Sequence, residues 1–591
     1  MIPNFRISGS PGNPRSESDI RVSPFDSRKI IAGANAINDA GQAQFFSSDG
    51  GGTWGQTTLP LHSGDSFSSD PCVDWTSDGT AWAITIGIDA SQANLILRAY
   101  SSTDAGASWT FDGNVAGTQT NADKPMMWAD HSSTSTFKDN IYATWHADAP
   151  VFVNRRTSAG WQTPVQVSGA ETTGTGIGGD VKSNSAGDVF AFWPDTVSST
   201  ASDVPGRIFV AKSTDGGVTF GAPVKVADTF DSYDIGIPSF ASRRALIYTS
   251  GGAFKTAGKD MAYVIWTDQA SNPGTSGGQN NEPGGDVNSS LKTRIWFSRS
   301  TDGAATWSAP VMINDQSSKN DQFNPKLAVD EANGQLVVIY YDTVGDPGRK
   351  KTDVWMQVSD DDGATWQKAF KVTSAQTDEA SGGDSGNQYG DYNGLSGVNG
   401  NFFPSWTDRR NGHDEEIWSA EVHTRKDAFF IVQRSTFGQD EVRAILGSPP
   451  SPAFIPQAFW VVVEGFTAAE LGLSPGNFGN PPNPPTIAFS PAVSGMSVHC
   501  TGVDPEDPSQ LDAPQRFRYA FEVIFFDDSA FNFMGDFEIV TLTASFSAIG
   551  IPVTANGQIE LIKQANPYIT NGETSWLSID LRVFQVKAGE G

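Results

Sequence analysis

An eight-residue turn motif recurs along the first two thirds of this chain and constrains the fold more than any other feature. The pattern S-x-D-x-G-x-[ST]-[WF] occurs at 47–54, 102–109, 213–220, 300–307 (with alanine in the glycine position) and 359–366. Its aspartates are 55, 111, 87 and 59 residues apart. Because 111 is about twice 55, a degenerate copy is expected near residue 160, where TSAGW at 157–161 lacks the aspartate. Internal repetition of this kind indicates an array or a propeller.

Each copy follows an apolar segment typical of a strand and precedes a shorter one, so we predict that the motif is a hairpin turn. Glycine allows the positive φ of such a turn, and the Ser, Asp and Thr side chains can cap backbone N–H groups. The terminal aromatic residue can pack between sheets. We therefore interpret the motif as structural and not as catalytic.

Two more strands are expected in each repeat. One ends in an aromatic-x-Asp pattern, as at 144–148 and 265–268, and the other opens with acidic or polar residues, as at 17–19 and 390–392. Four antiparallel strands are typical of a propeller blade. Seven such openings occur, and the last unit, 388–422, lacks a strand that residues 4–8 can supply. The sequence thus predicts an all-β fold, with a seven-bladed β-propeller over 1–425 closed by an N-terminal strand.

The remaining segment, 426–591, contains no copy of the motif. Apolar or alternating runs such as 459–463 and 519–526 flank a proline-rich bridge at 480–485. We predict a β-sandwich here, acting as an accessory or assembly domain. Glycan binding, self-assembly and docking to a larger surface all stay open for it.

Composition limits the function classes. A formal charge of −28 and a pI near 4.5 disfavour binding to nucleic acid or anionic lipid. No run of 18 apolar residues and no signal peptide is recognised, so we expect no membrane insertion. The low-Lys, Trp- and Gly-rich composition favours an extracellular or cell-surface location. Cys72 and Cys500 are distant in sequence and are expected to be buried thiols.

The repeated motif resembles the Asp-box, or bacterial neuraminidase repeat, of sialidases and related β-propellers, over about residues 1–425. The resemblance implies a propeller fold and a carbohydrate-related function. Sialidases carry an early Phe/Tyr-Arg-Ile-Pro motif and a late tyrosine nucleophile. Phe5-Arg6-Ile7-Ser8 is similar to the first, although the blade layout makes it an outer strand. The run 390–395 is similar to the strand of the late tyrosine, which corresponds to Tyr392.

In a propeller, the first strands begin and the second strands end at the same end of the central channel, which we call the mouth. The pattern therefore predicts many carboxylates there: Glu17, Asp19, Asp70, Asp123, Asp148, Asp180, Asp195, Asp234, Asp268, Asp342, Asp391 and Asp408. Crowded carboxylates raise one another's pKa unless cations neutralise them. Three roles stay open: hydrogen bonds to backbone N–H groups of neighbouring blades, a Ca²⁺ site and a catalytic pair of the glycosidase type.

For a hydrolase, we predict Asp391 and Asp19 as acid/base residues, Tyr392 as a nucleophile-like residue and Arg409 as an orienting cation. For a Ca²⁺ site, Asp180 and Asp391 are the candidate ligands. Predicted substrate-binding residues are Glu17, Asp70, Asp123, Lys124, His146, Asp148, Asp180, Asp408 and Arg410.

The leading hypothesis is a carbohydrate-recognising, sialidase-like propeller, and the enzymatic form of this hypothesis is a glycoside hydrolase acting on a glycan or polysaccharide at the mouth. A non-enzymatic lectin, adhesin or assembly subunit is the alternative. A polysaccharide lyase that uses His146 and Tyr392 is a second alternative. His131 is expected near the same mouth, and the insertion 269–290 is expected to form a rim or lid there. Trp145, Trp193, Trp266 and Trp406 could stack on sugars or be buried between blades.

Overall fold

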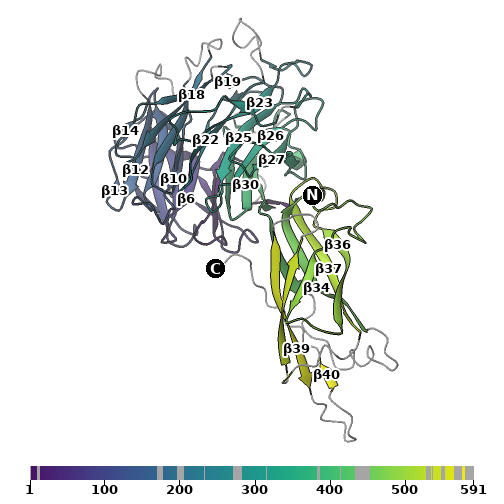
Figure 1. Cartoon of the computed structure of the whole chain (residues 1–591). Coiled ribbons are helices and arrows are strands. Elements are labelled where there is room, and N and C mark those ends of the chain that lie inside the picture. The colour runs from purple at the N-terminus through teal and green to yellow at the C-terminus, as the bar shows by residue number, and fades with distance from the viewer. Residues whose placement is uncertain are drawn as a thin grey trace. The chain divides into compact units, whose positions relative to one another are not determined.

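A computed structural model describes residues 2–8, 14–168, 177–195, 205–231, 233–270, 282–314, 316–381, 387–412, 414–432, 453–526, 534, 537–546, 553–564 and 576–578. Within these residues the chain is all-β, apart from a 3-10 turn η2 (Arg410–Gly412) (Figure 1). No helix in this part of the chain is long and apolar enough to cross a membrane. The chain divides into two compact units, residues 2–421 and 422–591.

The first unit contains a series of antiparallel sheets, each built from strands that follow one another in the chain. The first three sheets are β2 (Arg15–Val22), β3 (Ile30–Ala36), β4 (Ala43–Ser47), β5 (Gly55–Thr58); β6 (Phe67–Trp75), β7 (Ala81–Ile88), β8 (Leu95–Ser102), β9 (Thr110–Asn114); and β10 (Ala122–Ala129), β11 (Ile141–Ala147), β12 (Val151–Thr157), β13 (Gly160–Trp161), with β14 (Val165–Gln166) also on β12.

The next three are β15 (Asp180–Ser183), β16 (Val189–Asp195), β17 (Arg207–Ser213), β18 (Val224–Asp228); β21 (Ser250–Thr256), β22 (Lys259–Gln269), β23 (Thr293–Ser300), β24 (Val311–Met312); and β25 (Gln322–Val329), β26 (Leu336–Asp342), β27 (Asp353–Ser359), β28 (Phe370–Lys371). A small hairpin, β19 (Asp234–Ile235) and β20 (Ala245–Leu246), lies between the fourth and fifth sheets in the chain. The seventh sheet combines β29 (Gly394–Val398), β30 (Asn401–Asp408) and β31 (Glu416–Ala420) with β1 (Asn4–Arg6).

The N-terminal strand occupies an outer position. Asn4 is opposite Ala420 and Arg6 is opposite Trp418 in an antiparallel register, and Arg6 donates to Glu416 at 2.8 Å. The first strands of the seven sheets contact one another in a closed cycle: β2, β6, β10, β15, β21, β25, β29 and back to β2. This arrangement of sheets around an axis is that of a β-propeller.

Side chains of the first strands bind the backbone of the next sheet. Backbone N–H groups donate to carboxylates or hydroxyls across the gap in these pairs: Val73 to Asp19, Ala129 to Asp74, Gly251 to Asp180, Leu327 to Ser250, Gly400 to Asp330 and Val22 to Ser396. Burial without a partner would cost each such group free energy. These bonds therefore stabilise the ring and account for several polar residues in its interior.

All five copies of the repeated motif form the same hairpin turn. In each, the serine hydroxyl donates to the aspartate at 2.7–2.9 Å, and the Thr or Ser two positions after the glycine donates through both its N–H and its hydroxyl. These hydrogen bonds lower the pKa of Asp302 to about 2. Ala304 adopts a φ of 73°, which explains why the other copies have glycine there. The motif is thus a self-contained turn.

Replacing Asp302 by alanine should lower the free energy of unfolding by about 1–2 kcal/mol, because an exposed turn loses several hydrogen bonds. Denaturant unfolding would measure the loss. Asp286→Ala, at an exposed aspartate outside the motifs, is the control and should change stability much less. Equal stability of the Asp302 variant and the parent protein would show that the side chain does not hold the turn.

The second unit contains two four-stranded antiparallel sheets. One is β33 (Asp427–Val432), β34 (Ala453–Phe466), β37 (Gln515–Phe525) and β36 (Met496–Pro505); the other is β35 (Thr486–Ser490), β38 (Phe537–Ser545), β39 (Thr554–Gln564) and β40 (Trp576–Ser578), and β32 (Val422–His423) precedes them. Buried residues of both sheets, including Phe430, Phe521 and Leu542, form one hydrophobic cluster. Cys72 is buried and Cys500 is partly buried, and both are free thiols.

Candidate functional site at the mouth of the channel

The mouth contains an ion-pair cluster built from three distant segments. Asp391, just before β29, accepts from Lys124 on β10 through one oxygen and from Arg243 through the other. Arg243 lies between β19 and β20. The Asp391 side chain is only 7% exposed, so these pairs are largely removed from solvent. Two cations therefore hold one buried carboxylate in place.

Glu17 on β2 completes the cluster. Its Oε1 accepts from Arg243 at 3.2 Å and from the Asp391 N–H at 3.1 Å, and its Oε2 accepts from Asn35 at 2.8 Å. Gly390 makes this approach possible, because a Cβ at that position would lie 2.3 Å from Cγ of Glu17. The Asn35 oxygen accepts in turn from the N–H of Asp70 at 2.7 Å. The site thus links the first, second, third and seventh sheets.

A β-bulge that recurs at the start of several first strands orients these side chains. The register shifts at the start of β2, β6, β10 and β25. One residue at each shift has a φ between 49° and 55°: Glu17, Asp70, Lys124 and Asn324. A β-bulge re-aims a side chain. Left-handed φ is unfavourable for residues other than glycine, and such strain is concentrated at functional sites.

The two carboxyl groups of the cluster have pKa values shifted in opposite directions. Burial raises the pKa of Glu17, and the nearby charge of Asp391 raises it further. Burial opposes ionisation of Asp391 too, but Lys124 and Arg243 outweigh it and lower its pKa. Burial, followed by the charge of Glu17, raises the pKa of Asp70 well above its usual value. At neutral pH the arrangement favours an ionised Asp391 beside more readily protonated neighbours.

Aromatic residues lie beneath the ion pairs. Tyr392 and Tyr248 have ring centroids 6.0 Å apart and pack with Met126, Leu246 and, at the edge, Tyr233. Both Tyr392 and Tyr248 hydroxyls are buried without a hydrogen-bond partner. Burial raises the pKa of Tyr392 well above 10, so its phenol is protonated. A phenol in this state can donate a hydrogen bond but is a weak nucleophile.

Arg243 was missed by sequence reasoning because it lies in an insertion without a motif. The insertion is anchored over the mouth: Gln388 Oε1 accepts from the Arg243 N–H at 3.0 Å, and Phe240 packs against Phe323 and Tyr389 at 5.1 Å. The only available signal was the unusual length of chain between the fourth and fifth sheets. Residues 271–281 of the predicted insertion at 269–290 lie outside the described residues, and Glu282 after them pairs with Arg244.

Three predicted substrate-binding residues lie at the border of the cluster. Asp123 caps the Lys124 N–H at 2.8 Å, and its side chain is 40% exposed. His146 Nε2 lies 4.0 Å from Asp123, and burial lowers the pKa of His146, which keeps the imidazole neutral at neutral pH. Asp148 is exposed.

Other predicted residues have partners elsewhere. Asp19 accepts from Val73 N–H at 3.0 Å. Asp180 accepts from Lys182 at 2.6 Å and from Gly251 N–H at 2.9 Å. Asp408 accepts from Arg410 and from Trp406, and Arg410 lies over Trp418 at 4.1 Å. Arg409 donates to the Asp378 carbonyl at 2.8 Å. None of these contacts joins them to the Lys124–Asp391–Arg243 cluster.

The remaining carboxylates of the predicted ring also have local partners: Asp195 with Arg207, Asp234 with Arg244, Asp268 with backbone N–H groups of 230 and 269, and Asp342 with Asn320 and Gln322. The four predicted tryptophans, Trp145, Trp193, Trp266 and Trp406, are at most 1% exposed. Their burial agrees with one of their two predicted roles, packing between blades.

Both carboxylates that were predicted to bind Ca²⁺ form ion pairs with basic side chains. Asp391 is paired with Lys124 and Arg243, and Asp180 is paired with Lys182. Among the described residues, no group of three or more His, Cys, Asp or Glu side chains is arranged to hold a metal ion. The side chains as arranged do not fit a Ca²⁺ site at these two aspartates, and no catalytic step is derived through a metal.

Comparison with known proteins does not assign the chain to a family. No protein-family model and no curated sequence matches it. Similar solved structures include a protein of unknown function from Dyadobacter fermentans (13% identity, 71% of this chain and 97% of the other, TM-score 0.38). They also include the GH93 α-L-arabinofuranosidase of Fusarium graminearum (12%, 62% and 96%, 0.39) and the intramolecular trans-sialidase of Ruminococcus gnavus (14%, 71% and 96%, 0.35). The fold assignment therefore rests on this chain's own strand order.

Proposed function

We propose that the first unit is a seven-bladed Asp-box propeller that binds a glycan at the mouth and hydrolyses it by acid/base catalysis at Glu17 and Asp391. The second unit, interpreted as a β-sandwich, would be an accessory domain. An extracellular place of action belongs to the same proposal, because polysaccharide substrates are found there.

One observation supports the proposal most. Glu17 and Asp391 meet in one buried hydrogen-bonded cluster, and their pKa values are shifted apart. Environments that separate two carboxyl groups in this way identify an acid and its ionised partner. In glycoside hydrolysis, the protonated carboxyl gives its proton to the leaving oxygen as the glycosidic C–O bond breaks. A water molecule adds to the sugar carbon, and one proton of this water passes to the carboxylate.

The neighbouring residues have consistent roles in this proposal. Lys124 and Arg243 keep Asp391 ionised, and Arg243 also orients Glu17 through a 3.2 Å contact. Asp19, the acid predicted from the sequence, is replaced by Glu17 here, because Asp19 binds the neighbouring strand. Tyr392 would donate a hydrogen bond through its protonated phenol.

Glu17→Gln is the sharpest test. Because burial raises the pKa of Glu17, the neutral glutamine of the same shape should preserve the fold, whereas it cannot donate the catalytic proton. The kcat for sialosides, ulvan and plant polysaccharides should fall by about 10²–10⁴-fold. The acidic limb set by the Asp391 carboxylate should remain in the pH profile.

Glu421→Gln is the control, because this exposed glutamate is not among the predicted substrate-binding residues. It should retain turnover. Hydrolysis at the parental rate by the Glu17→Gln protein would contradict the proposal. An unsaturated sugar product would instead indicate a lyase, for which the neutral His146 is the candidate base.

Binding without turnover is the second candidate function. Its support is that many ring carboxylates bind backbone groups of neighbouring sheets, which suits a rigid platform for a lectin, adhesin or assembly subunit. A glycan array combined with the same substrate panel separates the two functions, because a lectin would retain glycan without releasing sugar.

A further inference from the structure

A histidine makes a contact across the far end of the central channel. His131 follows β10 in the third sheet, and Glu331 follows β25 in the sixth. These two sheets are three steps apart in the cycle of seven first strands, which is the largest separation that such a ring allows. The first strands begin at the mouth and end here, so His131 does not lie near the mouth, contrary to the sequence prediction. The contact therefore ties opposite sides of the ring.

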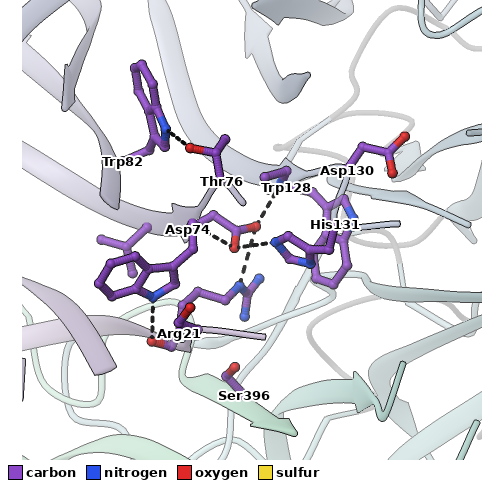
Figure 2. Close-up of polar contacts among 12 residues, drawn as sticks. Arg21, Asp74, Thr76, Trp82, Trp128, Asp130, His131 and Ser396 are labelled. Atoms are coloured by element: carbon purple, nitrogen blue, oxygen red, sulfur yellow. Dashed lines mark hydrogen bonds and ion pairs between the residues drawn. The ribbon is translucent and has the colours of Figure 1, made fainter. Parts of the chain in front are cut away.

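Both ring nitrogens of His131 face carboxylates. Nδ1 lies 2.7 Å from Glu331 Oε1, and Nε2 lies 3.0 Å from Asp74 Oδ1. Figure 2 shows Asp74 between the His131 imidazole and the Arg21 guanidinium. A neutral imidazole has one donor and one acceptor nitrogen, whereas the imidazolium donates through both. Because ionised carboxylates only accept hydrogen bonds, this geometry requires a charged His131.

The surroundings of His131 favour the charged form. Its side chain is 4% exposed, and burial alone would lower its pKa, but Glu331 and Asp74 outweigh burial and raise the pKa well above 6.5. Trp128 packs beside the imidazole, with ring centroids 5.0 Å apart. The titratable and charged groups on the neighbouring elements are Arg21 on β2, Asp74 on β6, Asp130 on the same segment, Lys182 on β15, Lys255 on β21 and Glu331 after β25.

The charges in this part of the channel balance only while His131 is charged. Four carboxylates act on the Arg21 guanidinium: Asp19, Asp74, Asp180 and Glu331. They are offset by four cations: Arg21, Lys182, Lys326 and His131. Loss of the proton from His131 would leave one excess negative charge in a largely buried cluster, which costs free energy.

The two carboxylates that contact His131 are held differently. Asp74 is buried, and its oxygens also accept from the N–H groups of Trp75 and Ala129, each at 2.8 Å. The Glu331 side chain is 42% exposed, and within the described residues it has no hydrogen-bond partner besides His131. A neutral imidazole would keep its N–H toward the buried Asp74 and turn a lone pair toward Glu331. Glu331 would then rotate into solvent, where its carboxylate is hydrated.

His131 and Glu331 also lie at the boundary of two cavities. One, of about 40 Å³, lies in the channel beside Arg21 and Lys182. The other is an adjoining groove of about 190 Å³. The residues that line both are Trp128, His131, Ser183, Ala253 and Glu331. Movement of the Glu331 side chain would therefore join the two spaces.

We propose that His131 and Glu331 form a proton-operated latch at the far end of the channel. The imidazolium holds the latch closed, and loss of its proton releases Glu331 and joins the channel cavity to the groove. The latch is separate from Glu17 and Asp391 and does not depend on glycan hydrolysis.

The direction of the pH dependence follows from linkage. Because the pKa of His131 is raised in the folded state, the latch is closed at neutral pH and opens as the pH rises through that pKa. Burial lowers the pKa of Lys182 to about 8, so Lys182 also titrates on the alkaline side. A measurement that reports His131 separately is therefore needed.

NMR of the full chain labelled with ¹⁵N-histidine provides this measurement. The His131 signals are those that disappear in His131→Gln, and both of its ring nitrogens should carry protons at about pH 7. Glu331→Gln should lower the pH at which His131 titrates by about 1–3 pH units, because an opposite charge at hydrogen-bond distance is lost. The variant should fold, since glutamine has the same shape and the side chain is partly exposed.

Glu522→Gln is the matched control. It removes the carboxylate that lies 3.2 Å from Nδ1 of His499, in an exposed His–Glu pair of the second unit. It should leave the titration of His131 unchanged.

Crystal structures below and above the measured titration of His131 show the latch directly. Above it, Glu331 should point into solvent, with ordered water joining the cavity and the groove. A neutral His131 at about pH 7, an unchanged titration of His131 in Glu331→Gln, or a Glu331 side chain that still contacts the neutral imidazole would each overturn the proposal.

Discussion

Replacing Asp391 by alanine should lower the free energy of unfolding by about 3–5 kcal/mol, the usual cost of removing one partner of a buried ion pair. The loss leaves Lys124 and Arg243 facing each other without their shared carboxylate. It also removes the charge that helps to raise the pKa of Glu17. Urea unfolding of the full chain, followed by tryptophan fluorescence, would measure the change.

A second substitution separates charge from packing. Lys124→Met combined with Asp391→Ala should recover part of the lost stability, because one of the two unpaired cations is gone. Asp148→Asn, at an exposed carboxylate on the same side, should cost little, because asparagine tolerates the positive φ of this position. A loss below about 1 kcal/mol for Asp391→Ala, on the scale of an exposed pair, would show that solvent reaches the cluster.

The stability of the propeller should fall between pH 5 and pH 8.5, and Glu379→Gln should remove part of this fall. Glu379 is 1% exposed, its Oε1 accepts from Thr377 at 2.6 Å, and its Oε2 has no hydrogen-bond partner. Burial raises the pKa of Glu379 from 4.5 to about 8, and the charges of Glu415 and Asp408 contribute.

The sign follows from linkage. A raised pKa in the folded state means that the protonated carboxyl contributes stability below about pH 4.5, and that this contribution is lost as pH rises through about 8. Its size is on the order of 4 kcal/mol. Glu379→Gln should therefore match the parent protein at pH 5 and exceed it in stability at pH 8.5.

Denaturant unfolding at the two pH values gives the required double difference, and Glu421→Gln, at an exposed glutamate, is the control. The comparison with the parent cancels other groups that titrate in this range, such as Asp268, whose pKa burial raises to about 7. The same pH dependence in Glu379→Gln and the parent protein would contradict the assignment.

Much of the fold could be predicted from short sequence patterns. The serine, the aspartate and the glycine or alanine of each repeated motif interact within seven residues, so their hairpins could be predicted without knowing what surrounds them. The outer position of Phe5 could be predicted by counting strands, and it pairs with Ser419. The candidate site was predicted less completely. Glu17, Lys124, Asp391 and Tyr392 were named, but the pairing of Asp391 with Lys124 was not predicted and Arg243 was missed.

Long-range contacts explain the difference. Arg243 reaches Asp391 across 148 residues and Lys124 reaches it across 267, and no sequence spacing encodes such pairs. Two carboxylates that are close together in the sequence also have different partners. Asp19 binds a neighbouring strand, whereas Glu17, two residues earlier, points toward the mouth because its φ is positive. The bulge decides this, and it depends on the neighbouring sheets.

The sequence by itself determined the repeating hairpins, because hydrogen bonds within a turn and the alternation of a strand are short-range. Only the tertiary structure decided which charges meet and which carboxyl keeps its proton. The physical reason is that burial and the field of distant groups set these properties, and both arise only when the first strands contact one another in a closed cycle.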